Sequence, residues 1–428
     1  MQARTVIDEL TERGFVSQMT ETGLAELAKK ERLVVYCGFD PTAPSLHLGH
    51  VVPIMALAHV QRYGGKSIFL IGGATAQIGD PSGKQSERTL LSKNEINQNA
   101  ESIKKQLSAF LKFESENPAE LLNNADWLEN QTLISFLRDT AKHFSLGYML
   151  AKESVKSRIE REQGISITEF LYGLLQSFDF WYLNKYFNCN VQIGGSDQWG
   201  NITAGIDYIR KMESKHVHGL TFPLLTKSDG SKFGKTETGA VWLDPTLTTP
   251  YQMYQYWLNT DDKDAIKFLK LFTFLPLEEI SQLDVLVQNE AEKRKAQATL
   301  AFEFTKMVHG EKNAKTAETA SEFLFGSSAN ELDIDSLNTI LDNIPSLDLN
   351  QLGLKIKDIN VVDALVLTKL AQSKGEARKI MAQGGLYVNN IRQKEMRNLT
   401  DEDFLHSKAI LLRSGKKNYA ALSIAGTK

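Results

Sequence analysis

Cysteine is scarce in this sequence of 428 residues, which contains only Cys37 and Cys189. Two cysteines so far apart exclude a disulfide framework and supply too few thiols for a structural zinc site. Long hydrophobic runs are also missing, since the most apolar stretch, near residues 51–60, is too short to cross a bilayer. The N-terminus mixes charged and apolar residues and lacks the apolar core of a signal peptide. We therefore expect a cytoplasmic protein with no membrane partner.

A net positive charge is absent as well. The formal net charge is −3, so any nucleic-acid partner must be held by a local basic patch. Residues 351–428 contain 14 lysines and arginines against seven acidic residues, whereas residues 316–354 contain seven acidic residues and no lysine or arginine. This asymmetry predicts a basic C-terminal module that binds nucleic acid, preceded by a charged linker with enough apolar spacing for a short helix.

The pattern of apolar residues predicts an α/β fold. Residues 33–37, 67–71 and 191–193 read as buried strands, and a helix is predicted from about Ser45 to Gly64. Strand, helix and strand at this spacing indicate a parallel sheet with crossover helices, in which ligands bind at the carboxyl ends of the strands. Helical patterns dominate from about residue 248 to residue 326. We predict a Rossmann-like parallel-sheet domain with an inserted helical segment at 1–246, an all-α domain at 247–326, an acidic linker at 327–352 and a small α+β module at 353–428.

The motif His47-Leu48-Gly49-His50 falls at the start of the first predicted crossover helix. Imidazoles at i and i+3 share one helix face, and the glycine between them lets a ligand approach the backbone closely. A helix N-terminus with imidazole donors suits a polyphosphate. Two neighbouring surface histidines are the alternative, and a zinc site is less favoured because no third ligand is suggested nearby.

A second motif, Lys232-Phe233-Gly234-Lys235-Thr236, follows a turn rich in glycine and polar residues. A mobile loop with two lysines and a hydroxyl can surround a transferring phosphate and neutralise developing charge. It lacks the Walker spacing, so a P-loop is not supported. Taken alone, the motif is also compatible with a solvated basic loop.

A helix predicted from Ser166 to about Phe187 carries a polar stripe. Tyr172, Gln176 and Asp179 recur at i, i+4 and i+7 on an otherwise apolar helix. Such a stripe either faces solvent or lines a pocket. Aromatic residues flank the stripe closely, and this favours the pocket.

The basic tail contains a third candidate site. A helix capped by Ser373 and ending near Gly384 is predicted to precede a strand. Lys374, Arg378 and Lys379 would line one side of this helix near its start. The tail's net charge favours an RNA contact over a solvated helix face.

Together, HLGH and KFGKT resemble the HIGH and KMSKS elements of class I aminoacyl-tRNA synthetases. Residues 36–42, 79–84 and 194–201 and the C-terminal module resemble the bacterial tyrosyl-tRNA synthetases, so the resemblance covers nearly the whole chain. It implies activation of L-tyrosine with ATP to tyrosyl-adenylate and pyrophosphate, and then transfer of tyrosine to the 3′ end of tRNA(Tyr). It also implies Mg²⁺ with the ATP, a homodimer, an anticodon-arm role for residues 247–326 and a tail like an RNA-binding module of a ribosomal small-subunit protein. KFGKT keeps both lysines of KMSKS but has Gly234 and Thr236 in place of its serines.

The resemblance also implies a role for each site residue. On the tyrosine side, the phenol is contacted by Tyr36 and Asp179, the ammonium by Asp80, Tyr172 and Gln176, and the carboxylate lies near Gln198. The nucleotide side comprises Cys37, Gly38, Asp40, Gly49, His50, Gly195 and Asp197. The shell around the departing pyrophosphate comprises Thr42, His47, Lys84, Arg88, Lys232, Lys235 and Thr236, and tRNA is contacted by Lys374, Arg378 and Lys379. No metal site built from protein side chains alone is expected.

Two other interpretations remain. A tryptophan-specific relative is disfavoured because an indole offers only an N–H donor, whereas Tyr36 with Asp179 suits a hydroxyl. A catalytically inactive RNA-binding or splicing protein could share the fold. The intact HLGH motif, Asp80 and the two loop lysines argue against such a loss of activity.

Overall fold

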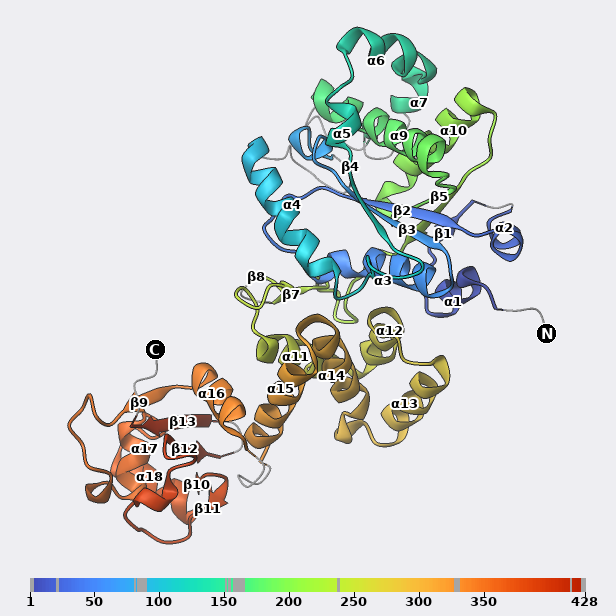
Figure 1. The fold of residues 1–428 in the computed structure, drawn as a ribbon. Helices are drawn as coiled ribbons and strands as arrows, with labels where there is room; N and C mark the ends of the chain where they lie inside the picture. The colour runs from blue at the N-terminus through green and yellow to red at the C-terminus, as the bar shows by residue number, and fades with distance from the viewer. Residues whose placement is uncertain are drawn as a thin grey trace. The chain divides into compact units, whose positions relative to one another are not determined.

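The computed structural model describes residues 4–20, 23–80, 82, 91–150, 152, 155–156, 166–236, 239–326, 332–415 and 418–424. The chain forms two compact units, one of residues 1–248 with 260–300 and the other of residues 249–259 with 301–428 (Figure 1). Within the described ranges, no helix has both the length and the apolar character needed to span a membrane.

The first unit is built on a six-stranded sheet. Its strands, in spatial order, are β1 (Gln18–Met19), β6 (His218–Phe222), β5 (Val191–Gly195), β2 (Val34–Phe39), β3 (Lys66–Ile71) and β4 (Glu120–Asn123). All neighbours run parallel except the edge strand β1. The three predicted strands are therefore confirmed as β2, β3 and β5, and their parallel pairing is confirmed.

The strand order reverses between β2 and β5. The chain moves outward from β2 through β3 to β4, then returns to the other side of β2 with β5 and β6. The loops after β2 and β5 therefore leave in opposite directions and open a crevice at the carboxyl ends of these strands, where ligands bind in open α/β sheets.

Helices cover both faces of this sheet (Figure 1). α3 (Leu48–Arg62) packs on one face, and α9 (Ile167–Phe187) and α10 (Trp199–Glu213) lie on the other. Tyr36 of β2 is buried in one core with Phe178 and Phe180 of α9. α9 begins as predicted, with Ser166 Oγ accepting the Glu169 N–H at 3.2 Å.

The remaining helices of the first unit frame this core. They are α1 (Val6–Glu12), α2 (Leu24–Lys30), α4 (Lys93–Leu107), α5 (Ala125–Leu128), α6 (Leu133–Asp139), α7 (Leu146–Leu150), α12 (Asp262–Phe272) and α13 (Leu277–Asn289). α14 (Lys295–His309) contains the boundary between the units. The buried Arg13 donates to the carbonyls of Lys270, Thr273 and Leu275, so the end of α12 is fastened to the N-terminal part of the unit.

The second unit contains a five-stranded sheet. Its order is β11 (Ile391–Arg392), β10 (Leu386–Val388), β12 (Ala409–Ser414), β13 (Asn418–Ser423) and β9 (Ser346–Asp348). Its helices are α11 (Pro250–Leu258), α15 (Glu311–Leu324), α16 (Ile334–Asn343), α17 (Val361–Leu367) and α18 (Lys374–Ala382). Alternate residues of β12 face opposite sides: Ile410 and Leu412 share a core with α17, whereas Ala409 and Leu411 share one with α15 and α16.

Two predictions from the sequence, the acidic linker and the capped helix of the tail, concern this unit. The stretch expected to be an acidic linker contains the predicted short helix, α16, and also β9, which pairs in parallel with β13. Residues 332–349 thus contribute to the folded unit. α18 begins as predicted, with Ser373 Oγ accepting the Glu376 N–H at 3.2 Å, and the chain then enters β10.

Candidate active site

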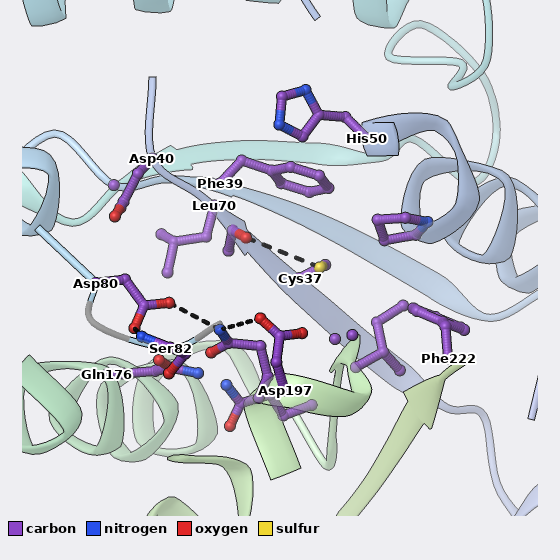
Figure 2. A pocket seen from close by; sticks show the side chains of 18 of the residues that line it. Cys37, Phe39, Asp40, His50, Leu70, Asp80, Ser82, Gln176, Asp197 and Phe222 are labelled. Atoms are coloured by element: carbon purple, nitrogen blue, oxygen red, sulfur yellow. Dashed lines mark hydrogen bonds between the residues drawn. The ribbon is translucent and has the colours of Figure 1, made fainter. Parts of the chain in front are cut away.

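A cavity of about 430 Å³ opens at the carboxyl ends of β2 and β5, where the strand order reverses (Figure 2). Four carboxylates line it: Asp40, Asp80, Asp179 and Asp197. Among the described residues, no lysine or arginine lines the cavity. This electrostatic character suits a ligand that brings its own positive charge.

The inner end of the cavity pairs a buried acceptor with a buried hydroxyl. Asp179 accepts hydrogen bonds from Trp127 Nε1 at 2.7 Å and Asn124 Nδ2 at 3.0 Å. Burial raises the pKa of Asp179 to about 7, although these two hydrogen bonds lower it; the nearby charge of Asp40 raises it further. The buried hydroxyl of Tyr36 has no hydrogen-bond partner within the described residues. Such a pair fits a ligand hydroxyl that both donates and accepts.

Tyr36 and Tyr172 both keep their phenolic protons. Burial, and then the charge of Asp179, raise the pKa of Tyr36 well above its usual value. Burial, and then the charge of Asp40, do the same for Tyr172, whose hydroxyl donates to Asp40 Oδ2 at 3.0 Å. Both side chains are therefore neutral hydrogen-bonding groups at any physiological pH.

Asp80 is held at a second point of the cavity. It accepts the Ser82 backbone N–H at 2.9 Å and Gln198 Nε2 at 2.7 Å (Figure 2). Asn201 Nδ2 lies 3.1 Å from Gln176 Oε1 and 3.3 Å from Gln198 Oε1. A network of amides thus orients a nearly buried carboxylate, which is suited to an ammonium group.

Two imidazoles cap the start of α3. The His47 backbone N–H donates to His50 Nδ1 at 3.3 Å, the Gly49 backbone N–H donates to His47 Nδ1 at 3.0 Å, and the rings stack with centroids 3.8 Å apart. Because a backbone N–H can only donate, each Nδ1 is an acceptor, and each neutral ring carries its hydrogen on Nε2. The pair therefore offers two Nε2–H donors at a helix N-terminus, a position that favours anions.

The structure brings the KFGKT loop against this helix start. Gly234 has a φ of 74°, and a Cβ there would lie 3.3 Å from Leu48 Cβ and 3.5 Å from the Gly49 nitrogen. The chain that follows is hydrogen-bonded to the first residue of α3, since the Leu48 N–H donates to the Val241 carbonyl at 3.1 Å. Two motifs some 180 residues apart in the sequence are thus neighbours.

The loop also rests on α12. Phe233 lines the cavity and packs on Phe268 and Phe272, with ring centroids 4.9 and 5.1 Å away. At the other end of the loop, the Ser228 N–H donates to the buried carboxylate of Asp264 at 2.8 Å. α12 is therefore the support on which the loop lies, while Lys232 and Lys235 remain exposed.

The residues predicted to bind tyrosine and ATP fall into three groups. Those that line the cavity are Tyr36, Cys37, Gly38, Asp40, Thr42, Gly49, His50, Asp80, Tyr172, Gln176, Asp179, Gly195, Asp197 and Gln198. His47, Lys232 and Lys235 belong to the two motifs beside it. Lys84, Arg88 and the side chain of Thr236 lie outside what the structure describes.

Some residues of the site carry no signal in the sequence analysis. Asn124 and Trp127 follow β4, and Thr75 follows β3, so all three stand at the carboxyl edge of the sheet. Their location after a strand could have indicated a role in the site. However, β4 is only four residues long, and its apolar and polar residues do not alternate, so the sequence pattern does not predict this strand. In the second unit, Lys374, Arg378 and Lys379 are exposed on α18, and Lys374 Nζ lies 2.7 Å from Asp363 Oδ1.

Comparison with known proteins identifies this arrangement. Residues 28–326 match the family model of class I tRNA synthetases for tryptophan and tyrosine, and residues 336–422 match that of the C-terminal domain of tyrosine–tRNA ligases. The chain is 48% identical over 417 residues to the tyrosine–tRNA ligase of Roseiflexus castenholzii, covering 97% of this chain and 98% of that protein. It is 49% identical over 418 residues to tyrosine–tRNA ligase 1 of Bacillus anthracis, with the same coverage.

The chain belongs to the tyrosine–tRNA ligase family. It is an enzyme of the class I aminoacyl-tRNA synthetases, which use ATP as a substrate. A truncated mitochondrial tyrosyl-tRNA synthetase of Aspergillus nidulans matches with a TM-score of 0.69 and 32% identity, over 76% of this chain and 95% of its own. A tryptophanyl-tRNA synthetase of Encephalitozoon cuniculi, at 12% identity and a TM-score of 0.52 over 78% of this chain and 90% of its own, shares the fold alone.

Proposed function

We propose that this family member activates L-tyrosine through the cavity residues named above and transfers it to the 3′ end of tRNA(Tyr). The observation that carries the assignment is the buried pair at the inner end of the cavity. The ionised Asp179 accepts a hydrogen bond from the phenol hydroxyl, and the Tyr36 hydroxyl donates a hydrogen bond to the phenol oxygen. Only a ligand hydroxyl can make both of these hydrogen bonds. Phenylalanine leaves the Tyr36 hydroxyl without a partner and brings no donor to Asp179.

The ammonium of the substrate is assigned to the second carboxylate. Asp80 is oriented by Gln198 and Ser82, and Gln176 belongs to the same amide network. Tyr172 adds a neutral hydroxyl oxygen on the same face of α9. With the amine and the phenol fixed, the substrate carboxylate is directed toward Gln198 and the nucleotide side, formed by Cys37, Gly38, Asp40, Gly195 and Asp197.

Adenylate formation requires no general base in this proposal. The tyrosine carboxylate is already ionised and attacks the α-phosphorus of ATP, and pyrophosphate leaves. The protein contributes positioning and stabilisation of the charge that moves onto the leaving phosphates. His47 and His50 supply Nε2–H donors, and Thr42, Lys84, Arg88, Lys232, Lys235 and Thr236 complete the pyrophosphate shell. In the second step, a terminal ribose hydroxyl of tRNA attacks the tyrosyl carbonyl and AMP leaves.

Mg²⁺ is proposed as the companion of ATP. Within the described ranges, no group of three or more His, Cys, Asp or Glu side chains is arranged to hold a metal. In proteins that bind ATP, Mg²⁺ is usually held through substrate phosphates, water and one or two carboxylates. When bound, the ion neutralises phosphate charge.

Recognition of tRNA is assigned to residues 247–428, which comprise the second unit together with residues 247–248 and 260–300 of the first. We propose residues 247–326 as an anticodon-arm domain and residues 353–428 as an RNA-binding module, joined by the acidic segment 327–352. Lys374, Arg378 and Lys379 are the proposed tRNA contacts. Replacing all three with alanine should weaken charging and its salt dependence but leave adenylate formation intact. A double Lys104→Ala, Lys105→Ala variant on the exposed face of α4 is the matched control.

A homodimer in the cytoplasm completes the proposal. α6 buries none of its side chains, and Leu133, Ile134 and Leu137 are 71%, 69% and 45% exposed. Ile167, at the start of α9, is 75% exposed. Large exposed apolar side chains grouped on one helix, as on α6, support an interface at that helix. Light scattering should give twice the chain mass, and the single-chain mass for Ile134→Asp.

The assignment as a whole is tested by ATP–pyrophosphate exchange. Tyrosine should support exchange, and phenylalanine and tryptophan should support little. Exchange that depends on tryptophan, or none with any of the three, would contradict the assigned pocket.

A further inference from the structure

Thr75 occupies a junction between the two ends of the tyrosine pocket. It lies at the start of a short 3₁₀ turn after β3, is 3% exposed and lines the cavity. Its hydroxyl donates to Asp40 Oδ1 at 2.7 Å and accepts Asn124 Nδ2 at 3.0 Å. A single hydroxyl therefore uses its one hydrogen and one lone pair on two different polar side chains.

From Thr75, the hydrogen bonds extend to both ends of the substrate site. Asp40 accepts the Tyr172 hydroxyl at 3.0 Å, and Asn124 donates to Asp179 at 3.0 Å. Tyr172 and Asp179 lie two turns apart on α9. The hydrogen-bonded series Tyr172–Asp40–Thr75–Asn124–Asp179 thus joins the ammonium end to the phenol end. It runs through the segments that follow β2, β3 and β4 rather than along α9.

The directions of these hydrogen bonds are fixed. Asn124 Oδ1 accepts the Ala74 backbone N–H at 2.9 Å, so the amide nitrogen of Asn124 must face Thr75 and Asp179. With Asn124 donating to Thr75, the threonine hydrogen is directed to Asp40. Gly72 leaves room for this contact, because a Cβ there would overlap both Asp40 Oδ1 and Thr75 Oγ1.

We propose that Thr75 is a positioning residue that couples recognition of the phenol to recognition of the ammonium. It holds Asp40 and Asn124 in register, and through them it keeps Tyr172 and Asp179 at the spacing that fits tyrosine. The inference rests on the proposed function of this cavity. It implies that selection at the two ends is not independent.

Thr75→Val removes the hydroxyl and keeps the branched shape, whereas Thr75→Ser keeps the hydroxyl. In ATP–pyrophosphate exchange with the full chain, Thr75→Val should raise the KM for tyrosine about tenfold and lower the tyrosine-to-phenylalanine ratio of kcat/KM about tenfold. Thr75→Ser, which keeps the hydroxyl that contacts Asp40 and Asn124, should stay close to wild type. Thr305→Val is the matched control, because the buried Thr305 hydroxyl has no partner among the described residues.

Coupling is measured by combining Thr75→Val with Tyr172→Phe. If Thr75 carries the coupling, Tyr172→Phe lowers the tyrosine-to-phenylalanine ratio in the wild-type background and has no further effect with Thr75→Val. Gly72→Ala crowds the Asp40–Thr75 contact and should change the KM for tyrosine and the tyrosine-to-phenylalanine ratio as Thr75→Val does. It therefore provides a second test if Thr75→Val is unstable.

The outcomes separate the two proposals. A wild-type enzyme without tyrosine-dependent exchange contradicts the proposed function itself. An active wild type overturns only the coupling if Thr75→Val matches it, if Thr75→Ser is as impaired as Thr75→Val, or if the Tyr172→Phe effects simply add.

Discussion

The two ends of the active site are built differently. At the tyrosine end, the four residues Tyr36, Asp80, Tyr172 and Asp179 are each at most 8% exposed. At the phosphate end, formed by His47, His50, Lys232 and Lys235, both lysines are exposed and sit on a loop that rests on α12. Tyr36, Tyr172 and Asp179 come from β2 and α9, whereas Asp80 lies in a loop; the phosphate end comes from a helix start and a loop.

This difference corresponds to two kinds of work. A buried set of fixed hydrogen-bonding groups selects a ligand by leaving partners unmatched when the wrong ligand binds. Exposed cations on a loop cost little desolvation before the reaction, and they contribute most when charge moves onto the phosphates. We therefore expect substitutions at the tyrosine end to change selection and those at the phosphate end to change rate.

Asp179→Ala should have the largest effect. It removes the acceptor for the phenol and leaves the indole N–H of Trp127 and one amide N–H of Asn124 unpaired in a buried site. Unpaired buried donors cost about 1–3 kcal/mol each, so tyrosine-dependent exchange should fall on the order of a thousandfold with little change in the KM for ATP. If the variant kept tyrosine-dependent exchange close to that of the wild type, the assignment of Asp179 to tyrosine binding would be wrong.

Lys232→Ala and Lys235→Ala should come next. Each removes a charge-assisted contact worth on the order of 3 kcal/mol in the transition state, so adenylate formation should slow roughly a hundredfold while the Kd for tyrosine hardly changes. His47→Ala should act in the same way. Lys267→Ala, on the exposed face of α12, is the control. A tenfold weaker Kd for tyrosine with an unchanged forward rate would make the loop a clamp on the amino acid instead.

The sequence was sufficient to predict those helices and strands that have a strong pattern of apolar residues. β2, β3, β5 and α9 were predicted from apolar runs and a helix cap, and the stripe from Tyr172 to Asp179 lies on the cavity side of α9. Both nucleotide motifs were visible as residue types at a helix start and in a glycine-containing loop.

Contacts between distant segments could not be read in the same way. Nothing in the local pattern around Asn124 or Trp127 indicates that these residues meet Asp179, because the contact depends on the register of β4 beside β3. The three-residue strand β9 could not be predicted from its own sequence either, because its pairing with β13 depends on the sheet that it joins. The support of the KFGKT loop by Phe268 likewise appears only when α12 is in place.

Phe233→Ala tests whether α12 positions the phosphate end. Loss of the packing on Phe268 and Phe272 should loosen the loop and slow adenylate formation about tenfold, with no change in tyrosine selection. Phe233→Leu, which keeps an apolar anchor, should recover most of the rate. In a Lys235→Ala background, the loss from Phe233→Ala should shrink, because a loop that has lost its cation gains less from correct placement. Fully additive losses would indicate that Phe233 acts independently of the lysine.

The smallest effect, and the one most specific to the tyrosine end, is a dependence on pH. Burial raises the pKa of Asp179 to about 7, and the phenol proton is accepted by the ionised form. As the pH falls through that value, Asp179 takes up a proton and tyrosine must displace it. For one such group, kcat/KM for tyrosine should fall roughly fourfold between about pH 8 and about pH 6.5.

The stability of the folded protein should change with pH in the opposite direction to kcat/KM. A carboxyl with a raised folded-state pKa binds its proton in the folded chain before the unfolded chain does, so this group makes the free protein more stable as the pH falls from about 7 toward about 4. Asp179→Asn cannot titrate and should remove both trends, whereas Asp197→Asn, at the nucleotide side, should remove neither. Measuring kcat/KM and Tm across this range for both variants decides the matter. A tyrosine profile that keeps its fall near pH 7 in Asp179→Asn would assign the titration to another group.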